Sequence, residues 1–190
     1  MLQAIKQLDI SLFLYLNGLH APFPDHVMWL ASDKFFWIPL YIWFLWLLYR
    51  RYPKHFWLII ITIVLMILAG DQLSRSFKDL FGRYRPTHEP AIQHLVHTVN
   101  GYMGGSYSFF SGHATNSFAV ALFMISMLPG SRKFIVPVAL TYAVLVSYSR
   151  IYLGVHYPVD VLTGAIVGSL IGWGASRLFH LVERKWLKLD

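Results

Sequence analysis

Five long apolar runs alternate with short polar segments along most of the chain. No Lys, Arg, Asp or Glu occurs in residues 35–49, 56–70, 114–131, 134–149 and 161–176. With its weakly polar flanks, each run reaches the length of about 20 residues that a helix needs to cross a bilayer. The runs do not alternate with period two, which argues against a transmembrane β-barrel. The pattern therefore predicts an all-α, polytopic membrane helix bundle of five to six transmembrane helices.

Turn-forming and polar residues between the runs set the boundaries of the predicted spans. We expect five spans, over residues 26–49, 55–77, 111–128, 134–150 and 158–181. Pro39 is expected to kink the first span, and Pro158 to begin the fifth at a first helical position. In the fifth span Gly164, Gly168 and Gly172 recur every four residues. Such a stripe of small residues favours close packing against another helix.

Two segments outside the spans complete the predicted domain. Residues 3–19 are amphipathic and short, which favours a helix at the membrane interface over a further span, so residues 1–22 are assigned as an N-terminal amphipathic helix. Residues 82–110 form a long polar loop. We expect no cleavable signal peptide, because the N-terminus lacks a basic region and a small-residue cleavage site. Residues 1–190 are interpreted as a single integral-membrane domain.

The composition agrees with a membrane protein and argues against binding of nucleic acid. The chain is 56% hydrophobic and 13% charged, whereas soluble domains carry roughly 25% charged residues. The net charge is +7, but the basic residues lie in short loops or polar segments and do not form a basic face or tail. The absence of cysteine excludes disulfide bonds and thiolate metal sites.

The distribution of basic residues predicts the orientation in the membrane. Eight of them fall on one side of the predicted bundle: Arg50, Arg51, Lys54, Arg132, Lys133, Arg184, Lys185 and Lys188. The positive-inside rule makes that side cytoplasmic. The loop at residues 82–110 is then extracytoplasmic. We expect a bacterial inner-membrane protein whose polar site faces the periplasm.

Three polar segments lie at the ends of apolar runs on that opposite side: residues 78–86, 111–113 and 149–160. Charged residues at such positions are costly and mark candidate functional sites. In the second segment Ser111 and Gly112 begin a span, and the unpaired N–H groups of a helix N-terminus bind anions such as phosphate. The alternative is that Ser111 only caps the helix.

The third segment holds a histidine and a carboxylate in a catalytic spacing. His156 and Asp160 lie four residues apart across the start of the fifth span, so they are expected to share one face. A carboxylate that accepts from one imidazole nitrogen leaves the other free to attack as a nucleophile. Alternatively, Asp160 is a first-turn acid favoured by the helix dipole and His156 an interface residue.

Three cations are candidates to surround a phosphate. Arg85 and Arg150 offer planar forks for bidentate contact, and Lys78 offers a point charge. Phosphoryl transfer depends mainly on positioning and charge stabilisation, so several fixed cations are its expected equipment. The alternative is that such residues reach lipid headgroups, which is our interpretation of Arg75 and Arg83.

The joint spacing of these residues is more specific than any one of them. The sequence reads Lys78-x6-Arg85-Pro86, then Ser111-Gly112-His113, then Ser149-Arg150-x5-His156-x3-Asp160. This order resembles the three-part signature of the type 2 phosphatidic acid phosphatase superfamily. One departure is Phe110, which stands where these families usually have proline before Ser-Gly-His. We expect that departure to affect loop rigidity or headgroup fit and not the chemistry.

The resemblance implies a role for each residue. His156 would attack phosphorus and form a phosphohistidine, Asp160 would orient His156, and His113 would protonate the leaving oxygen and then activate water. The phosphate would be held by Lys78, Arg85, Ser111, Gly112 and Arg150. No metal or other cofactor is implied, since cationic side chains take the place of Mg²⁺. The spacing of His94 and His97 is compatible with zinc, but no second ligand pair supports it.

The predicted function is that of an integral-membrane lipid phosphatase. Substrates of the related enzymes include undecaprenyl diphosphate, phosphatidylglycerol phosphate, phosphatidic acid and the phosphates of lipid A; we favour an isoprenoid diphosphate or lipid A. A transporter would need polar residues near the centres of its spans, and this sequence shows no inverted repeat of the kind found in many transporters. Vanadate-dependent haloperoxidases share the motifs but are soluble. A catalytically inactive lipid-phosphate-binding protein is disfavoured by the intact His113, His156 and Asp160. No protein partner is implied.

Overall fold

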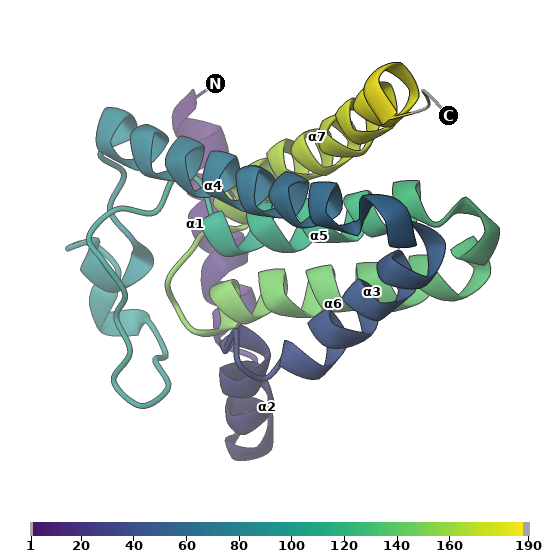
Figure 1. Ribbon diagram of the computed structural model, residues 1–190. Coiled ribbons are helices and arrows are strands. Elements are labelled where there is room, and N and C mark those ends of the chain that lie inside the picture. Colours follow the sequence, from purple (N-terminus) through teal and green to yellow (C-terminus); the bar gives the residue numbers. More distant parts are fainter. Residues whose placement is uncertain (1, 188–190) are drawn as a thin grey trace.

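The computed structural model describes residues 2–187 and is all-helical over that range (Figure 1). Its α-helices are α1 (Leu2–Asn17), α2 (Pro22–Ser32), α3 (Ile38–Arg51), α4 (Phe56–Phe81), α5 (Gly112–Met127), α6 (Arg132–Tyr152) and α7 (Pro158–Val182), and a π-helical turn (Glu183–Leu187) follows α7. One isolated antiparallel bridge joins Tyr84 to Tyr107, and residues 2–187 contain no strand. Lys188, one of the basic residues used to predict orientation, lies outside the described residues. The predicted all-α class is confirmed.

Three helical segments are long and apolar enough to cross a membrane: Pro53–Phe81, Pro129–Tyr152 and Pro158–Lys185. They contain α4, α6 and α7, and they identify an integral membrane protein. With 14 and 16 residues, α3 and α5 are shorter than these three. At a rise of about 1.5 Å per residue, neither covers the full thickness of a hydrocarbon core of about 30 Å.

The first predicted span is wrong as a single helix. Residues 26–49 are divided between α2 and α3, with a break after Ser32. Asp33 stabilises the turn at this break, because its Oδ1 accepts a hydrogen bond from the Phe35 N–H at 2.9 Å. Pro39 does not kink a helix as we expected but lies in the first turn of α3, where its missing N–H costs no hydrogen bond. The uncharged run at residues 35–49 does contain a helix, but the turn inside the predicted span at residues 26–49 was missed.

The glycine stripe of α7 packs directly against α5. A Cβ added at Gly168 would collide with the backbone of Thr115, and one at Gly172 with the backbone of Ala119. Gly164 approaches the carbonyl of Ser111 in the same way. Small residues allow helix backbones in membranes to come this close. The predicted packing role of the stripe is therefore confirmed, and it places the start of α5 beside the first turn of α7.

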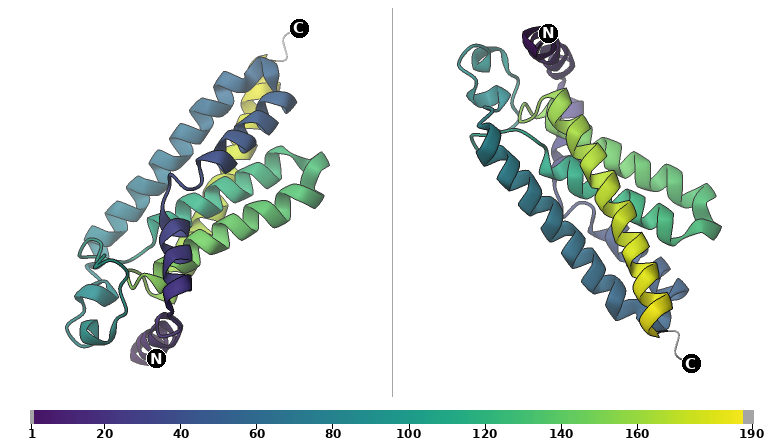
Figure 2. Two further views of the ribbon diagram at one scale, coloured as in Figure 1. Left: turned by 90° about the horizontal axis from the view of Figure 1, so that it is seen from below. Right: turned by 90° about the horizontal axis from the view of Figure 1, so that it is seen from above.

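The polar segments gather at one end of the bundle. Figures 1 and 2 show the turn between α3 and α4, the turn between α5 and α6, and the end of α7 pointing away from the loop at residues 82–110. The helices α1 and α2 lie at the loop end. Asn17 ties α1 to this end, because its side chain donates to the Tyr152 carbonyl at 2.8 Å and accepts from the His97 N–H at 2.8 Å. This end therefore combines the N-terminal helices, the loop and the α6–α7 connection.

Candidate active site

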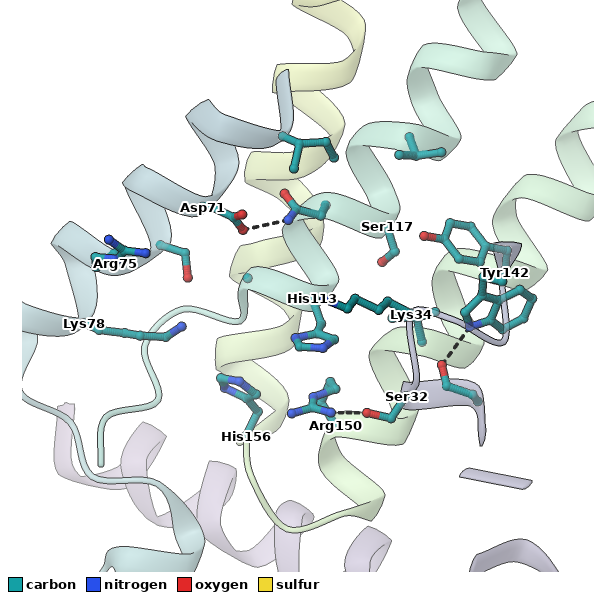
Figure 3. A pocket seen from close by; sticks show the side chains of 18 of the residues that line it. Ser32, Lys34, Asp71, Arg75, Lys78, His113, Ser117, Tyr142, Arg150 and His156 are labelled. Carbon is teal, nitrogen blue, oxygen red and sulfur yellow. Dashed lines mark hydrogen bonds between the residues drawn. The ribbon is translucent and has the colours of Figure 1, made fainter. Parts of the chain in front are cut away.

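One cavity brings residues from all three polar segments together. It has a volume of about 770 Å³ and lies between α3, α4, α5 and α6 at the loop end. Among the sequence-predicted site residues, those that line it are Lys78, Arg85, Gly112, His113, Arg150 and His156. Figure 3 shows His113 and His156 next to each other, with Arg150 below His113 and beside His156, and Lys78 reaching in from α4. Residues that are more than 70 positions apart thus form one site.

His156 lies in the short connection between α6 and α7. Its side chain is nearly fully buried, with 1% exposure, and its backbone N–H donates to the Arg150 carbonyl at 3.2 Å. Burial, reinforced by the positive charges of Arg85, Arg150 and Lys78, lowers the pKa of His156 well below its usual value. The imidazole is therefore neutral near pH 7 and keeps a lone pair available for attack on phosphorus.

Asp160 lies behind His156 in the first turn of α7 and does not line the cavity. Its Oδ2 accepts from the Tyr157 N–H at 2.9 Å, and its Oδ1 accepts from Arg83 Nη1 at 2.8 Å. The distance from Oδ2 to His156 Nδ1 is 3.7 Å, which is longer than a hydrogen bond. The carboxylate is thus next to the imidazole and fixed by two other donors.

Arg83 is a functional-site residue that our sequence reasoning missed. We interpreted it as a cation for lipid headgroups, but its guanidinium joins two carboxylates: Asp160, and Asp9 of α1, whose Oδ2 lies 2.6 Å from Nη2. It also lies over the Tyr157 ring, 3.9 Å from the centroid. Asp9 accepts from the Val159 N–H at 2.9 Å as well. A buried carboxylate needs such partners, so the Arg83 interpretation was wrong.

The two arginines of the cavity are held by residues outside their own segments. Arg150 Nη1 donates to Ser32 Oγ and Nη2 donates to the Tyr102 hydroxyl at 3.0 Å, while Nε has no partner among the described residues. Arg85 Nε donates to the Tyr107 carbonyl at 3.0 Å, and its buried Nη1 is likewise unpartnered in residues 2–187. Burial and the charge of Arg150 lower the pKa of Arg85. Unpaired donors on buried cations are suited to an anionic ligand.

Gly104 explains how the loop approaches Arg85 so closely. Its φ is +69°, in the left-handed region that glycine occupies without strain, and a Cβ there would collide with the Arg85 guanidinium. A larger residue at this position would therefore displace Arg85 from the cavity wall.

Ser111 and Gly112 take different places at the start of α5. Ser111 is fully buried and outside the cavity wall, and its Oγ accepts from the Ala114 N–H at 3.4 Å, as a helix N-cap does. Gly112 lines the cavity. Before them, Phe110 packs its buried ring against Phe77, with centroids 5.3 Å apart, and its carbonyl accepts from Ser74 Oγ at 2.9 Å. The residue that replaces proline is thus anchored by packing on α4.

The loop histidines make local contacts away from the cavity. His97 Nε2 lies 3.1 Å from Asp25 Oδ1, and its ring stacks on His20 with centroids 3.8 Å apart. Asp25 also accepts from the Tyr152 hydroxyl at 2.6 Å. His94 is exposed. These contacts dock the loop on α2 and on the end of α6.

The fold and the cavity together define a class: an integral-membrane helix bundle with two histidines and several cations around a pocket at one end. The sequence profile of the PAP2 superfamily matches residues 56–184. The chain belongs to the PAP2 superfamily. It is a membrane lipid phosphatase, a hydrolase that acts on phosphoric esters.

Individual relatives and solved structures agree with this family. The chain is 38% identical to a lipid A 4'-phosphatase of Porphyromonas gingivalis, over 98% of this chain and 79% of the relative. It is 37% identical to a lipid A 4'-phosphatase of Bacteroides thetaiotaomicron, over 97% and 81%. The crystal structure of a PAP2-type phosphatidylglycerolphosphate phosphatase from Bacillus subtilis matches with a TM-score of 0.70 and 26% identity, over 96% of this chain and 89% of that one.

Proposed function

We propose that this enzyme hydrolyses a phosphate monoester of a membrane lipid, and that the reaction passes through a phosphohistidine intermediate. The observation that carries the proposal is the convergence of His113 and His156 with three cations on one cavity. Lys78, Arg85 and Arg150 would hold the phosphate oxygens, with the Gly112 amide at the start of α5. Ser111, which we expected among these ligands, instead caps α5 from outside the cavity wall. These fixed cations stabilise the charge of the transition state, so the proposed reaction needs no metal or other cofactor.

The proposed reaction has two steps. In the first, the unprotonated nitrogen of His156 attacks phosphorus, the bond from phosphorus to the lipid oxygen breaks, and that oxygen takes a proton from His113. In the second, His113 takes a proton from water, and the resulting hydroxide displaces His156 to release inorganic phosphate. Asp160 keeps the His156 ring in place throughout, from its position beside Nδ1.

The proposed substrate is lipid A carrying a phosphate at the 4' position. This choice is supported by the identity of 37–38% to two lipid A 4'-phosphatases over almost the whole chain. An undecaprenyl-diphosphatase of Sulfolobus acidocaldarius is 31% identical over 90% of the chain, which supports undecaprenyl diphosphate as the second candidate. Both are lipids whose phosphate lies at the membrane surface, and no protein partner enters the proposal.

A panel of lipids tests this function. The purified enzyme in detergent with EDTA is expected to release inorganic phosphate from lipid A 4'-phosphate faster than from undecaprenyl diphosphate, phosphatidylglycerol phosphate or phosphatidic acid. Phosphate release is measured colorimetrically over time. Strict dependence on added Mg²⁺ would contradict the metal-independent mechanism, and a preference for undecaprenyl diphosphate would contradict the proposed substrate.

We further propose that residues 1–190 form one inner-membrane domain whose site faces the periplasm. The three long segments cross the bilayer, and the shorter α3 and α5 complete five spans with the help of their flanking turns. The exposed aromatic residues of α3, such as Trp46, suit a lipid-facing surface. α1 would lie in the interface, since Leu8 and Leu12 are exposed on it while Phe13 is buried.

Cysteine labelling tests this orientation. A cysteine at Gly105, where added side-chain atoms meet nothing within 4 Å, is expected to react with an impermeant thiol reagent in intact spheroplasts. A cysteine at the exposed Ser131, in the α5–α6 turn, is expected to react only after lysis. The chain has no native cysteine to confuse the readout. Labelling of Ser131→Cys in intact spheroplasts would reverse the proposed topology.

A further inference from the structure

The cavity extends beyond the residues that would hold a phosphate. Its volume of about 770 Å³ lies in the range that accommodates a ligand of drug size, which is far larger than one phosphate. On α4 and α5 its wall continues from Lys78 and His113 to Asp71, Asn116 and Ser117 (Figure 3). This deeper part of the wall must therefore face another portion of the substrate.

Asp71 is the unusual member of this deeper wall. It precedes Lys78 by two helical turns, about 10 Å along α4, inside the segment Pro53–Phe81 that is apolar enough to span. A carboxylate at such a depth is costly and marks a functional site. Within residues 2–187 it forms no ion pair, and its one hydrogen bond is from Asn116 Nδ2 to Oδ1 at 2.7 Å. Its other oxygen keeps its full capacity to accept.

A purely structural role accounts for only part of this arrangement. The Asp71–Asn116 bond ties α4 to α5, as polar side chains do between membrane helices. Asp71 is exposed to the cavity side of α4 and not buried in the packing, and a neutral acceptor would form the same tie without a charge in an apolar segment. The carboxylate instead presents a free acceptor to a polar cavity, which is the group needed to bind a hydroxyl donor.

The opposite wall of the cavity is aromatic. Trp37, Tyr41 and Tyr142 line it, and the two tyrosine hydroxyls are 2.9 Å apart. The Trp37 indole N–H donates to the Ala31 carbonyl at 2.8 Å, so its polar atom is already satisfied. Flat apolar rings facing a carboxylate and an amide match a sugar ring, which has C–H faces and hydroxyls around its edge.

Other leaving groups match this surface less well. A polyprenyl chain has no donor for Asp71, and burying the carboxylate against it would be unfavourable. The negative charge of Asp71 would repel the second phosphate of a diphosphate placed beside it, whereas Arg75 and Lys34, which also line the cavity, would attract it. The free acceptor of Asp71 therefore favours a hydroxyl-bearing group beside it.

We propose that Asp71 and Asn116 form a subsite for the sugar ring that carries the scissile phosphate, with Trp37 and Tyr41 against its face. The proposal rests on the phosphatase function above and specifies how its substrate class is selected. A site built to bind a hydroxyl discriminates strongly against substrates that lack it. The loss of one charge-assisted hydrogen bond lowers kcat/KM by about 10- to 100-fold.

The test compares Asp71→Ala with the matched control Asp79→Ala. Asp79 is an exposed carboxylate on the same helix that does not line the cavity. Asp71→Ala is expected to lower kcat/KM for lipid A 4'-phosphate by about 10- to 100-fold, and to leave kcat/KM for phosphatidic acid and the competitive inhibition constant of inorganic phosphate unchanged. Asp79→Ala is expected to match the wild type in all three.

The possible contrary results have distinct meanings. If Asp71→Ala lowers kcat/KM equally for lipid A 4'-phosphate and phosphatidic acid, or leaves the ratio of the two values unchanged, the sugar subsite would be overturned. A wild-type enzyme that hydrolyses phosphatidic acid or undecaprenyl diphosphate but not lipid A 4'-phosphate would also overturn it, and in that case the phosphatase function would stand. A wild-type enzyme inactive on every lipid would instead refute the proposed function, and this is seen before any variant is made.

Discussion

Replacing His156 by alanine is expected to reduce phosphate release to the background rate, a fall of at least about 10⁴-fold. Arg85, Arg150 and Lys78, the cations nearest to His156, offer no lone pair for attack, and the neighbouring His113 is assigned to proton transfer in the proposed mechanism. The loss should be in kcat, since the three cations that bind the phosphate remain. The measurement is phosphate release from lipid A 4'-phosphate in detergent with EDTA.

The control for this prediction is His94→Ala, which removes an exposed imidazole from the same end of the molecule. It is expected to keep wild-type activity. Brief incubation with ³²P-labelled substrate followed by alkaline quenching should label the wild type and His94→Ala, but not His156→Ala. An acid-stable label, or a label in His156→Ala, would point to another nucleophile and contradict the phosphohistidine.

The parts of this structure that follow from local sequence were predictable. The five runs without charge correspond to the helices α3 to α7. The glycine stripe that ends at Gly172 packs on α5, as its spacing indicates. The motif residues Lys78, His113 and His156 meet in one cavity, and their spacing had already indicated a common site. Each of these features depends on periodicity or on a motif with a known order, which a single sequence displays.

The features that were missed depend on contacts between distant segments. Arg83 looks like any basic residue in a loop, and only the fold reveals that it joins Asp160 to Asp9 of α1. Ser32 accepts from Arg150 across more than 100 positions, and nothing in the sequence around Ser32 signals that bond. The N-terminal helices, which lie outside the matched family segment at residues 56–184, therefore help to fix the site.

The break inside the first predicted span has a similar explanation. Residues 35–49 carry no charge, and the length that this run reaches with its flanks predicts one helix over residues 26–49. The turn is instead set by a single capping bond from Phe35 to Asp33 and by Pro39 at a helix start. The break lets the α2–α3 connection bring Ser32 and Lys34 to the cavity wall. A small local signal thus has a direct consequence for the site.

Replacing His113 by alanine is expected to separate the two chemical steps. Without the proton donor, release of phosphate from a lipid ester should fall by about 10²- to 10⁴-fold. An aryl phosphate with an acidic leaving group needs no such proton, so it should still phosphorylate His156 in this variant. Because the variant also lacks the base that activates water, the phosphoenzyme should accumulate, and it can be measured as alkali-stable label from ³²P-labelled aryl phosphate.

The double variant His113→Ala/His156→Ala provides the control, since it retains Lys78, Arg85 and Arg150 and should bind phosphate without any label. More label in His113→Ala than in the wild type means that the imidazole acts in the second step, because loss of the acid alone would leave breakdown fast. Together with the loss of activity on the lipid ester, it assigns His113 to both steps. Wild-type hydrolysis of the lipid by His113→Ala would remove His113 from the mechanism. Equal losses on lipid and aryl esters with no accumulated label would limit it to binding phosphate, as expected of a residue that only lines the cavity.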